Sequence, residues 1–151
     1  MNRIDQEKEN LRKKKVLVVG AGRSGICAAN LLQSIGCRAT LSECQIDSQK
    51  ERVLKRMESK GLRVELGPQK ESIFCDHDMI VLSPGVDPNI SALQKARLNN
   101  IPIISEIELG FRLIKHPVIA ITGTNGKTTT CTLLDEIFRN ARIKILPPFI
   151  L

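Results

Sequence analysis

Residues 16–25 have the sequence V-L-V-V-G-A-G-R-S-G, in which four apolar residues lead into three glycines spaced as G-x-G-x-x-G. The apolar run has the length and the β-branched content of a buried strand. The residues that follow, 24–35, carry apolar side chains at helical spacing and stop at Gly36. A glycine loop between a strand and a helix lets backbone N–H groups approach an anion at the helix N-terminus. The stretch therefore predicts an α/β fold that binds a nucleotide.

An acidic residue follows the glycine loop at a characteristic distance. Glu43 lies about 20 residues beyond the loop, at the end of a strand predicted over 38–43. A carboxylate in this place can accept a hydrogen bond from a ribose hydroxyl or from a base N–H. These residues leave three interpretations open: a nicotinamide or flavin dehydrogenase, a domain for another nucleotide, and a tight turn without a ligand.

Short apolar runs alternate with amphipathic stretches over the following residues. We predict helices over 47–60 and 89–99, strands over 63–66, 79–82 and 101–104, and a helix capped by Ser105 with Glu106 and Glu108 in its first turn. Such alternation specifies a parallel sheet covered on both faces. We expect a Rossmann-like domain over 1–105, in which 1–14 form a solvated, partly helical charged arm, and the truncated start of a second domain over 106–151.

A second loop has the sequence A-I-T-G-T-N-G-K-T-T-T at residues 120–130, between a strand predicted over 118–122 and a helix predicted over 127–140. Gly123 and Gly126 allow the backbone to wrap around phosphates, Lys127 neutralises their charge, and the Thr128 hydroxyl can bind Mg²⁺. This loop predicts ATP binding. It is shorter than the common phosphate-binding loop, whose first glycine is replaced here by Ile121.

Composition and charge exclude several other classes. The formal charge is +7, but 6 of the 23 basic residues lie in the first 15 positions, and no Trp or Tyr is present to stack on bases. We therefore expect no nucleic-acid partner. The apolar runs are far shorter than the roughly 20 residues that span a bilayer, and the N-terminus lacks the apolar core of a signal peptide. We expect a cytoplasmic protein without a membrane partner.

Cysteine and histidine do not form a recognisable site. The five cysteines include no C-x-x-C pair, which favours free thiols over disulfides or a zinc site. His77 and His116 stand apart from each other in sequence, and we expect both in turns or on the surface.

Three segments taken together resemble a known family. The loop T-G-T-N-G-K-T-T at 122–129 follows a Rossmann-like domain and the segments S-P-G-V-D at 83–87 and I-P-I-I-S-E-I-E-L-G at 101–110. In this order they resemble the Mur ligases of bacterial peptidoglycan synthesis, and within them the branch that adds D-glutamate. The resemblance runs from about residue 15 to residue 140. It implies an ATP-dependent amide ligase with the substrates UDP-MurNAc-L-alanine and D-glutamate.

The resemblance also implies the site residues. It assigns UDP, and not a nicotinamide, to the first glycine loop, with Glu43 reading uracil. The implied UDP-substrate contacts are Gly20, Gly22, Arg23, Ser24, Gly25, Glu43, Ser83, Pro84 and Gly85. The implied ATP contacts are Gly123, Thr124, Asn125, Gly126, Lys127, Thr128 and Thr129, among which Lys127 and Thr128 are catalytic and Thr128 binds Mg²⁺ with ATP. Cys44 and Gln45 are less typical of a uracil pocket.

The resemblance does not extend to the last residues, A-R-I-K-I-L-P-P-F-I-L. We expect an N-terminal portion of a ligase, from a truncation or a frameshift, that is inactive by itself. The complete family protein is expected to be monomeric, and an exposed apolar stripe on 127–140 to favour self-association of this chain. The alternatives are a non-catalytic nucleotide-binding Rossmann module and an NAD-dependent oxidoreductase.

Overall fold

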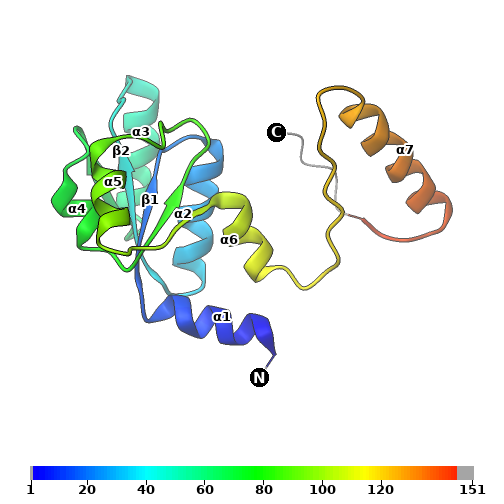
Figure 1. The fold of residues 1–151 in the computed structure, drawn as a ribbon, viewed down its shortest axis with the longest axis horizontal. Helices are drawn as coiled ribbons and strands as arrows, with labels where there is room; N and C mark the ends of the chain where they lie inside the picture. Colours follow the sequence, from blue (N-terminus) through cyan, green and yellow to red (C-terminus); the bar gives the residue numbers. More distant parts are fainter. Residues whose placement is uncertain (1, 146–151) are drawn as a thin grey trace. The chain divides into compact units, whose positions relative to one another are not determined.

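A computed structural model describes residues 2–145 of the chain. The chain divides into two compact units, of which one ends at Lys115 and the other begins at His116 (Figure 1). The first unit thus extends ten residues beyond the boundary expected at residue 105.

The first unit is built on a five-stranded parallel sheet in the order β3-β2-β1-β4-β5. The strands are β1 (Lys15–Val19), β2 (Arg38–Glu43), β3 (Arg63–Leu66), β4 (Met79–Leu82) and β5 (Ile103–Ser105). The predicted α/β Rossmann-like sheet is confirmed. The bounds of β2, β3 and β4 agree with the prediction, whereas β5 begins two residues later than expected.

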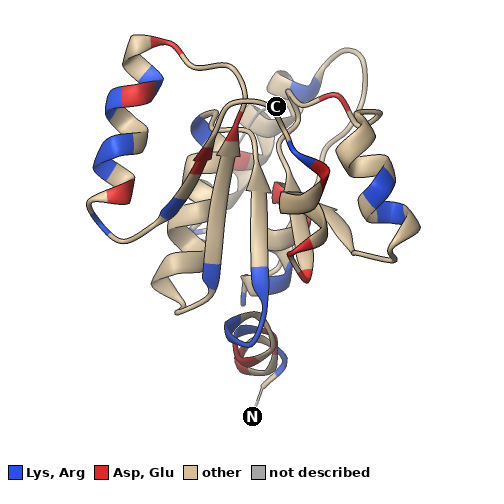
Figure 2. Cartoon of the chain, turned by 90° about the vertical axis from the view of Figure 1, so that its left-hand side faces the viewer, with Lys and Arg blue, Asp and Glu red and all other residues tan. Residues whose placement is uncertain are grey.

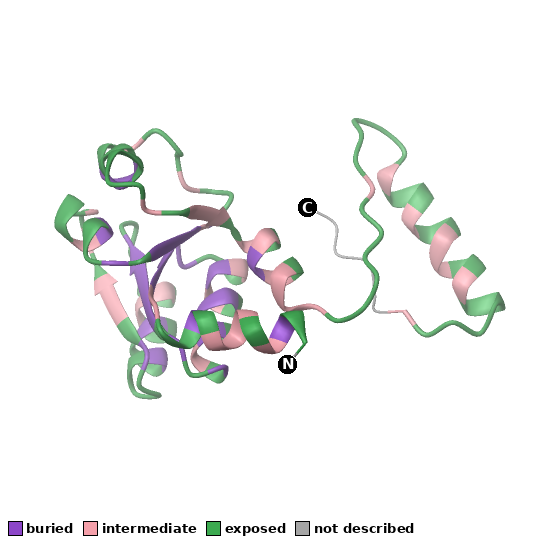
Figure 3. Cartoon of the chain, turned by 60° about the horizontal axis from the view of Figure 1, so that its bottom comes forward, coloured by how far each residue is buried: buried purple, intermediate pink, exposed green. Residues whose placement is uncertain are grey.

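Helices cover both faces of this sheet, because alternate residues of each strand point to opposite sides. The helices are α1 (Arg3–Arg12), α2 (Arg23–Ser34), α3 (Ser48–Glu58), α4 (Glu71–Cys75), α5 (Ser91–Leu98) and α6 (Glu106–Leu113). Val16 and Val18 pack in a core with buried residues of α1, α2, α3 and α6. Leu17 and Val19 pack on the other side against α4 and α5. Figure 3 shows buried residues along the strands between the two helical layers. The short helix α4, which buries Phe74, was not predicted.

The N-terminal segment is a packed helix and not a solvated arm. The Asn2 side chain caps α1 by accepting from the backbone N–H of Ile4 and Asp5. Ile4 and Leu11 are buried, and Leu11 belongs to the core under α2. Charged residues dominate the sequence of this helix, but two apolar residues seven positions apart lie on one face, which is sufficient to dock it.

The second unit contains α7 (Lys127–Asn140), with the predicted bounds. No residue of α7 is buried (Figure 3). The strand predicted over 118–122 does not form, so that prediction is wrong for this structure. A parallel strand needs a neighbour to satisfy its backbone, and residues 116–145, all within the described chain, contain no other strand.

None of the helices in the described chain is long and apolar enough to cross a membrane.

Candidate nucleotide site

The glycine loop after β1 is shaped by contacts that only glycine permits. Gly20 has a φ of +100°, a left-handed conformation that favours glycine. A Cβ on Gly25 would lie 1.9 Å from the carbonyl oxygen of Gly20, so α2 packs against the end of β1 at a distance that excludes any side chain. A Cβ on Gly22 would meet no atom within 4 Å, because this residue borders open space. The first and third glycines therefore build the loop, and the second leaves room for a ligand.

The N-terminus of α2 faces this space. Gly22 is its N-cap, and in the described chain no side chain accepts a hydrogen bond from its first turn. Backbone N–H groups in the first turn of a helix lack partners within the helix and attract anions. Arg23 is exposed at this terminus and Ser24 is half-buried. A phosphate would find backbone donors and one cationic side chain here.

Glu43 ends β2 beside the same loop. Its residue surface is only 6% exposed. Its Oε2 accepts the Ala21 backbone N–H at 2.9 Å and the Lys50 ammonium at 3.2 Å, and its Oε1 accepts the Gln45 backbone N–H at 2.8 Å. Burial by itself raises the pKa of Glu43, but the hydrogen bonds from Gln45, Ala21 and Lys50 together outweigh it and lower the pKa below its ordinary value. Glu43 is therefore a carboxylate at neutral pH.

The segment after β4 completes the arrangement. Ser83 is buried, and its backbone N–H donates to Val19 O at 3.0 Å. Its hydroxyl lies 3.1 Å from Gly20 O and 2.5 Å from Glu106 Oε1. Pro84 and Gly85, which follow, are exposed.

These three segments meet at one edge of the sheet. Gly20, Glu43 and Ser83 lie at or just after the carboxyl ends of β1, β2 and β4. After β1 the chain adds β2 and β3 on one side of β1, and it then adds β4 and β5 on the other side of β1. The direction in which strands are added therefore reverses between β1 and β4. Ligands of open α/β sheets bind at this kind of switch point. The structure thus brings together the residues assigned to UDP from sequence, while their contacts with a ligand remain a prediction.

The loop assigned to ATP lies in the second unit. Gly126 is left-handed, with a φ of +79°, and caps α7. The Lys127 ammonium folds back over the loop and donates to Gly123 O at 2.7 Å. Thr124, Asn125, Thr128 and Thr129 are exposed. The assignment of this loop to phosphates, and of Thr128 to Mg²⁺, stays a prediction.

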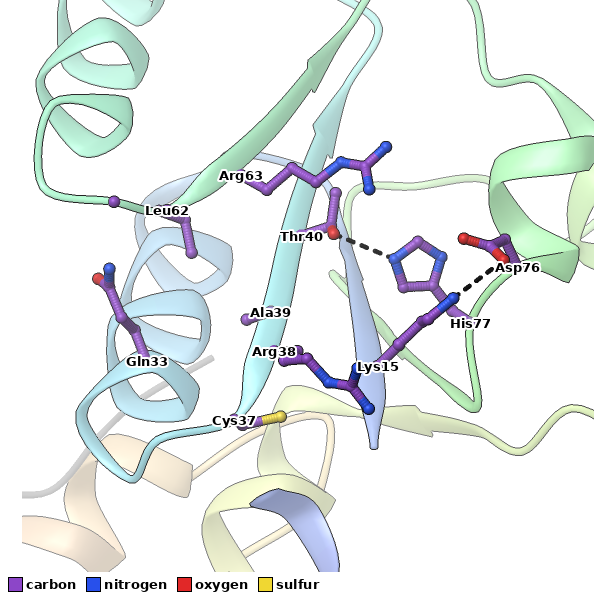
Figure 4. A pocket seen from close by; sticks show the side chains of 11 residues that line it. Lys15, Gln33, Cys37, Arg38, Ala39, Thr40, Leu62, Arg63, Asp76 and His77 are labelled. Carbon is purple, nitrogen blue, oxygen red and sulfur yellow. Dashed lines mark hydrogen bonds and ion pairs between the residues drawn. The ribbon is translucent and has the colours of Figure 1, made fainter. Parts of the chain in front are cut away.

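A cavity of about 490 Å³ lies at the opposite, amino edge of the sheet (Figure 4). Lys15, Arg38 and Arg63, the first residues of β1, β2 and β3, line it. Asp76 pairs with Lys15 at 3.1 Å and Glu65 pairs with Arg63 at 2.9 Å, so most of the positive charge is compensated. Figure 2 likewise shows acidic and basic residues interspersed along the helices and strand ends.

His77 lines this cavity from the turn between α4 and β4, which is one of its two predicted places, but it is not on the surface. The residue is buried, with Nδ1 2.6 Å from Ile73 O and Nε2 3.0 Å from Thr40 Oγ1. A carbonyl oxygen only accepts, so Nδ1 carries a hydrogen and donates to Ile73 O, while Nε2 forms a hydrogen bond with the Thr40 hydroxyl. His77 is a hydrogen-bonded residue of the fold, far along the strands from the glycine loop.

Sequence reasoning missed two side chains of the nucleotide site. Lys50 was part of a predicted helix, and Glu106 was interpreted as a first-turn acid that stabilises a helix. Their contacts with Glu43 and Ser83 join segments 7 and 23 residues apart. For Glu106, the strand register offers a signal: Leu82 pairs with Ser105, so Ser83 and Glu106 follow side by side.

The fold and the loop geometry define a Rossmann-like domain. Residues 14–105, more than half of the chain, match the family described as "Mur ligase MurD-like, N-terminal domain". The chain therefore belongs to the MurD-like family of Mur ligases.

Relatives and solved structures agree with this assignment. The chain is 43% identical over 137 residues to UDP-N-acetylmuramoylalanine–D-glutamate ligase of Koribacter versatilis, covering 91% of the chain and 30% of that protein. It is 44% identical over 129 residues to the ligase of the same name from Geotalea daltonii, covering 85% of the chain and 28% of that protein. The chain thus spans less than a third of the length of these relatives.

Two solved ligases share the fold. A pseudomurein peptide ligase type C from Methanothermus fervidus is 32% identical, with a TM-score of 0.54, over 85% of this chain and 26% of that one. UDP-N-acetylmuramate-alanine ligase MurC from Thermotoga maritima is 24% identical, with a TM-score of 0.55, over 85% of this chain and 30% of that one. The second likeness bears on the fold alone.

Proposed function

We propose that this chain supplies the UDP-substrate site and the ATP loop of a ligase that joins D-glutamate to UDP-MurNAc-L-alanine. The observation that carries the proposal is the meeting of the glycine loop, the Glu43 carboxylate and the Ser83–Gly85 segment at the switch point of the sheet. The relatives named as D-glutamate ligases support the choice of substrate. We place the reaction in peptidoglycan precursor synthesis in the cytoplasm, where UDP-linked precursors and ATP are available.

The occupied acceptor positions of Glu43 favour a uracil base over a ribose diol. A carboxylate offers about four acceptor positions, two on each oxygen. Oε2 already accepts from Ala21 and Lys50, whereas Oε1 accepts from Gln45 alone. One position on Oε1 suits the single N3–H of uracil. A ribose diol, which presents two hydroxyls, would have to displace Lys50 to use both oxygens.

The ATP loop would supply the energy for amide formation. In the proposed reaction the carboxylate of UDP-MurNAc-L-alanine takes the γ-phosphoryl group of ATP, and the amine of D-glutamate then displaces phosphate. The N-terminus of α7, where no side chain of the described residues forms a cap hydrogen bond, and the Lys127 ammonium support phosphate binding. Thr128, exposed at that terminus, fits the hydroxyl ligand of Mg²⁺ in such loops, and the ion would neutralise phosphate charge. Lys127 would hold the phosphates in place for transfer.

Calorimetric titration of the chain with UDP-MurNAc-L-alanine, ATP-Mg²⁺ and NADH in parallel tests the proposal. We expect binding of UDP-MurNAc-L-alanine that Glu43→Ala weakens, and binding of ATP-Mg²⁺ that Lys127→Ala weakens. Tighter binding of NADH than of the UDP substrate would support an oxidoreductase instead. Binding of the UDP substrate without any ATP binding would reduce the chain to a non-catalytic nucleotide module.

A further inference from the structure

The hydroxyl of Ser83 has two acceptors and only one proton. Gly20 O lies 3.1 Å from Ser83 Oγ, and Glu106 Oε1 lies 2.5 Å from it. A hydrogen bond to a carboxylate is shorter and stronger than one to a peptide carbonyl. The proton therefore points to Glu106. A Ser83 hydroxyl engaged in this way has no proton left for a ligand phosphate.

Glu106 occupies a well-supported position. Leu82 of β4 pairs with Ser105 of β5, which places Glu106 beside Ser83 at the same sheet edge. The Ser105 hydroxyl caps α6 by accepting from the Glu108 backbone N–H at 3.1 Å. Buried Leu109 then fixes the next turn of α6 in the core. The carboxylate therefore starts from a backbone that strand pairing, a cap and core packing all hold.

Helix α1 adds a second support for α6. Arg112 of α6 forms an ion pair with Glu7 of α1 at 3.5 Å and with Glu108 at 2.9 Å. The Arg3 guanidinium lies 5.7 Å from the centre of the Phe111 ring. Both helices lie outside residues 14–105, the part that matches the family. The segments flanking the family domain thus pack on each other and hold Glu106.

We propose that Glu106 is a positioning residue of the UDP-substrate site. By accepting the Ser83 hydrogen bond it holds the loop from Ser83 to Val86 against the glycine loop, so that the exposed backbone at Gly85 borders the ligand's diphosphate. Ser83 then acts by shaping this loop and not as a donor to the ligand. The inference rests on the proposed function, because it takes the ligand of this edge to be a UDP compound.

Binding of UDP and of UMP by the full chain and its variants tests the inference. We expect Glu106→Ala to weaken UDP binding about tenfold, the scale of one hydrogen bond to a charged group, and to change UMP binding much less. Glu106→Gln keeps an acceptor oxygen and should restore most of the UDP affinity. Glu108→Ala is the matched control: it removes another first-turn carboxylate of α6 and its pair with Arg112 within the helix, while the Glu7–Arg112 pair to α1 and the Ser83 contact are retained.

Three results would overturn the inference. Unchanged UDP affinity in Glu106→Ala would show that the loop needs no support from Glu106. Equal losses of UDP and UMP affinity would point to a general loss of structure. Tighter UDP binding by both Glu106 variants would mean that this carboxylate acts mainly by repelling the diphosphate.

Hydrogen exchange without ligand separates this inference from the proposed function. The Val86 backbone N–H donates to Ser83 O at 3.1 Å and reports the closure of the loop. We expect Glu106→Ala to speed exchange at Val86 about tenfold, with Glu106→Gln and Glu108→Ala close to the unaltered chain. If the unaltered chain fails to bind UDP while Val86 responds in this way, the proposed function is wrong and the positioning contact stands. An exchange rate at Val86 that is the same in Glu106→Ala as in the unaltered chain would refute the positioning contact itself.

Discussion

The Glu43 carboxylate accepts the backbone N–H of Ala21 at 2.9 Å, across a sequence separation of 22 residues. This bond ties the end of β2 to the glycine loop that follows β1. A second bond, from the Gln45 backbone N–H at 2.8 Å, orders the chain just after β2. An acid expected to read a base therefore also builds the pocket in which the base would lie.

Replacement of Glu43 should affect both the fold and the ligand. We expect Glu43→Ala to weaken UDP-substrate binding by about 1–3 kcal/mol and to lower the free energy of unfolding by a similar amount, because two backbone donors lose a charged acceptor. Urea denaturation and calorimetry measure the two effects. Glu65→Ala is the control. It removes the ion pair between Glu65 and Arg63 of β3 and should lower the free energy of unfolding by about 0.5 kcal/mol. Equal UDP affinity before and after the Glu43 change would remove this residue from the site.

Acid should destabilise the first unit partly through Glu43. Its pKa is lowered from the ordinary 4.5 in the folded chain, so its contribution to stability is complete above that value and is lost as the pH falls through the lowered folded pKa. Unfolding free energy followed from neutral pH to pH 3 should therefore drop. In Glu43→Gln, which cannot ionise, this part of the drop should be absent. An identical acid profile for both chains would contradict the lowered pKa.

The third glycine of the loop, Gly25, should tolerate substitution far less than the second, Gly22. We expect Gly25→Ala to cost about 3 kcal/mol or more, because its Cβ would lie 1.9 Å from Gly20 O and force α2 away from β1. Gly22→Ala should cost less than about 1 kcal/mol, since Gly22 has a φ of −69° and no atom near its Cβ position. Thermal or urea unfolding of both variants checks the contrast. Similar losses would mean that the close approach of loop and helix does not occur.

Cysteine reactivity should separate the buried thiol from the exposed ones. Burial raises the pKa of Cys37 to about 11, whereas Cys27, Cys44 and Cys75 are exposed. At pH 8 we expect iodoacetamide to modify the exposed thiols first and Cys37 only on unfolding, because the thiolate is the reactive form. Mass spectrometry of the time course identifies each site. Cys44 follows Glu43 directly, so a bound UDP substrate should slow its modification and leave Cys75 unchanged.

The second unit should exchange its amide hydrogens much faster than the sheet of the first. Residues 118–122 form no strand, and α7 buries no residue within the described chain. We therefore expect weak protection over 118–140 and strong protection over β1 and β4. Lys127→Ala should leave the stability of the first unit unchanged, and light scattering should show whether the exposed Leu133 and Ile137 drive self-association. Strong protection of α7 in a monomer would contradict this expectation.

Local patterns were sufficient to predict most of the elements. The apolar runs gave the bounds of β2, β3 and β4, and the Ser105 cap with its first-turn acids predicted the start of α6. The spacing of Gly20, Gly22 and Gly25 predicted the loop because the close approach of α2 to β1 leaves no room for a Cβ. These features depend on interactions between residues near one another in the chain, which a sequence displays directly.

Tertiary structure determined the features that local sequence patterns did not predict or predicted wrongly. The charged segment 3–12 is a packed helix because two of its apolar residues are buried. His77 can be buried because Ile73 and Thr40 form hydrogen bonds with both of its ring nitrogens. Residues 118–122 have the composition of a strand but form none, since backbone pairing needs a neighbour that residues 116–145 do not offer. The contacts of Glu43 with Lys50 and of Ser83 with Glu106 likewise depend on which segments the sheet brings together. Sequence thus determined most of the elements and the two glycine loops, while the order and register of the strands determined which side chains meet at the candidate site.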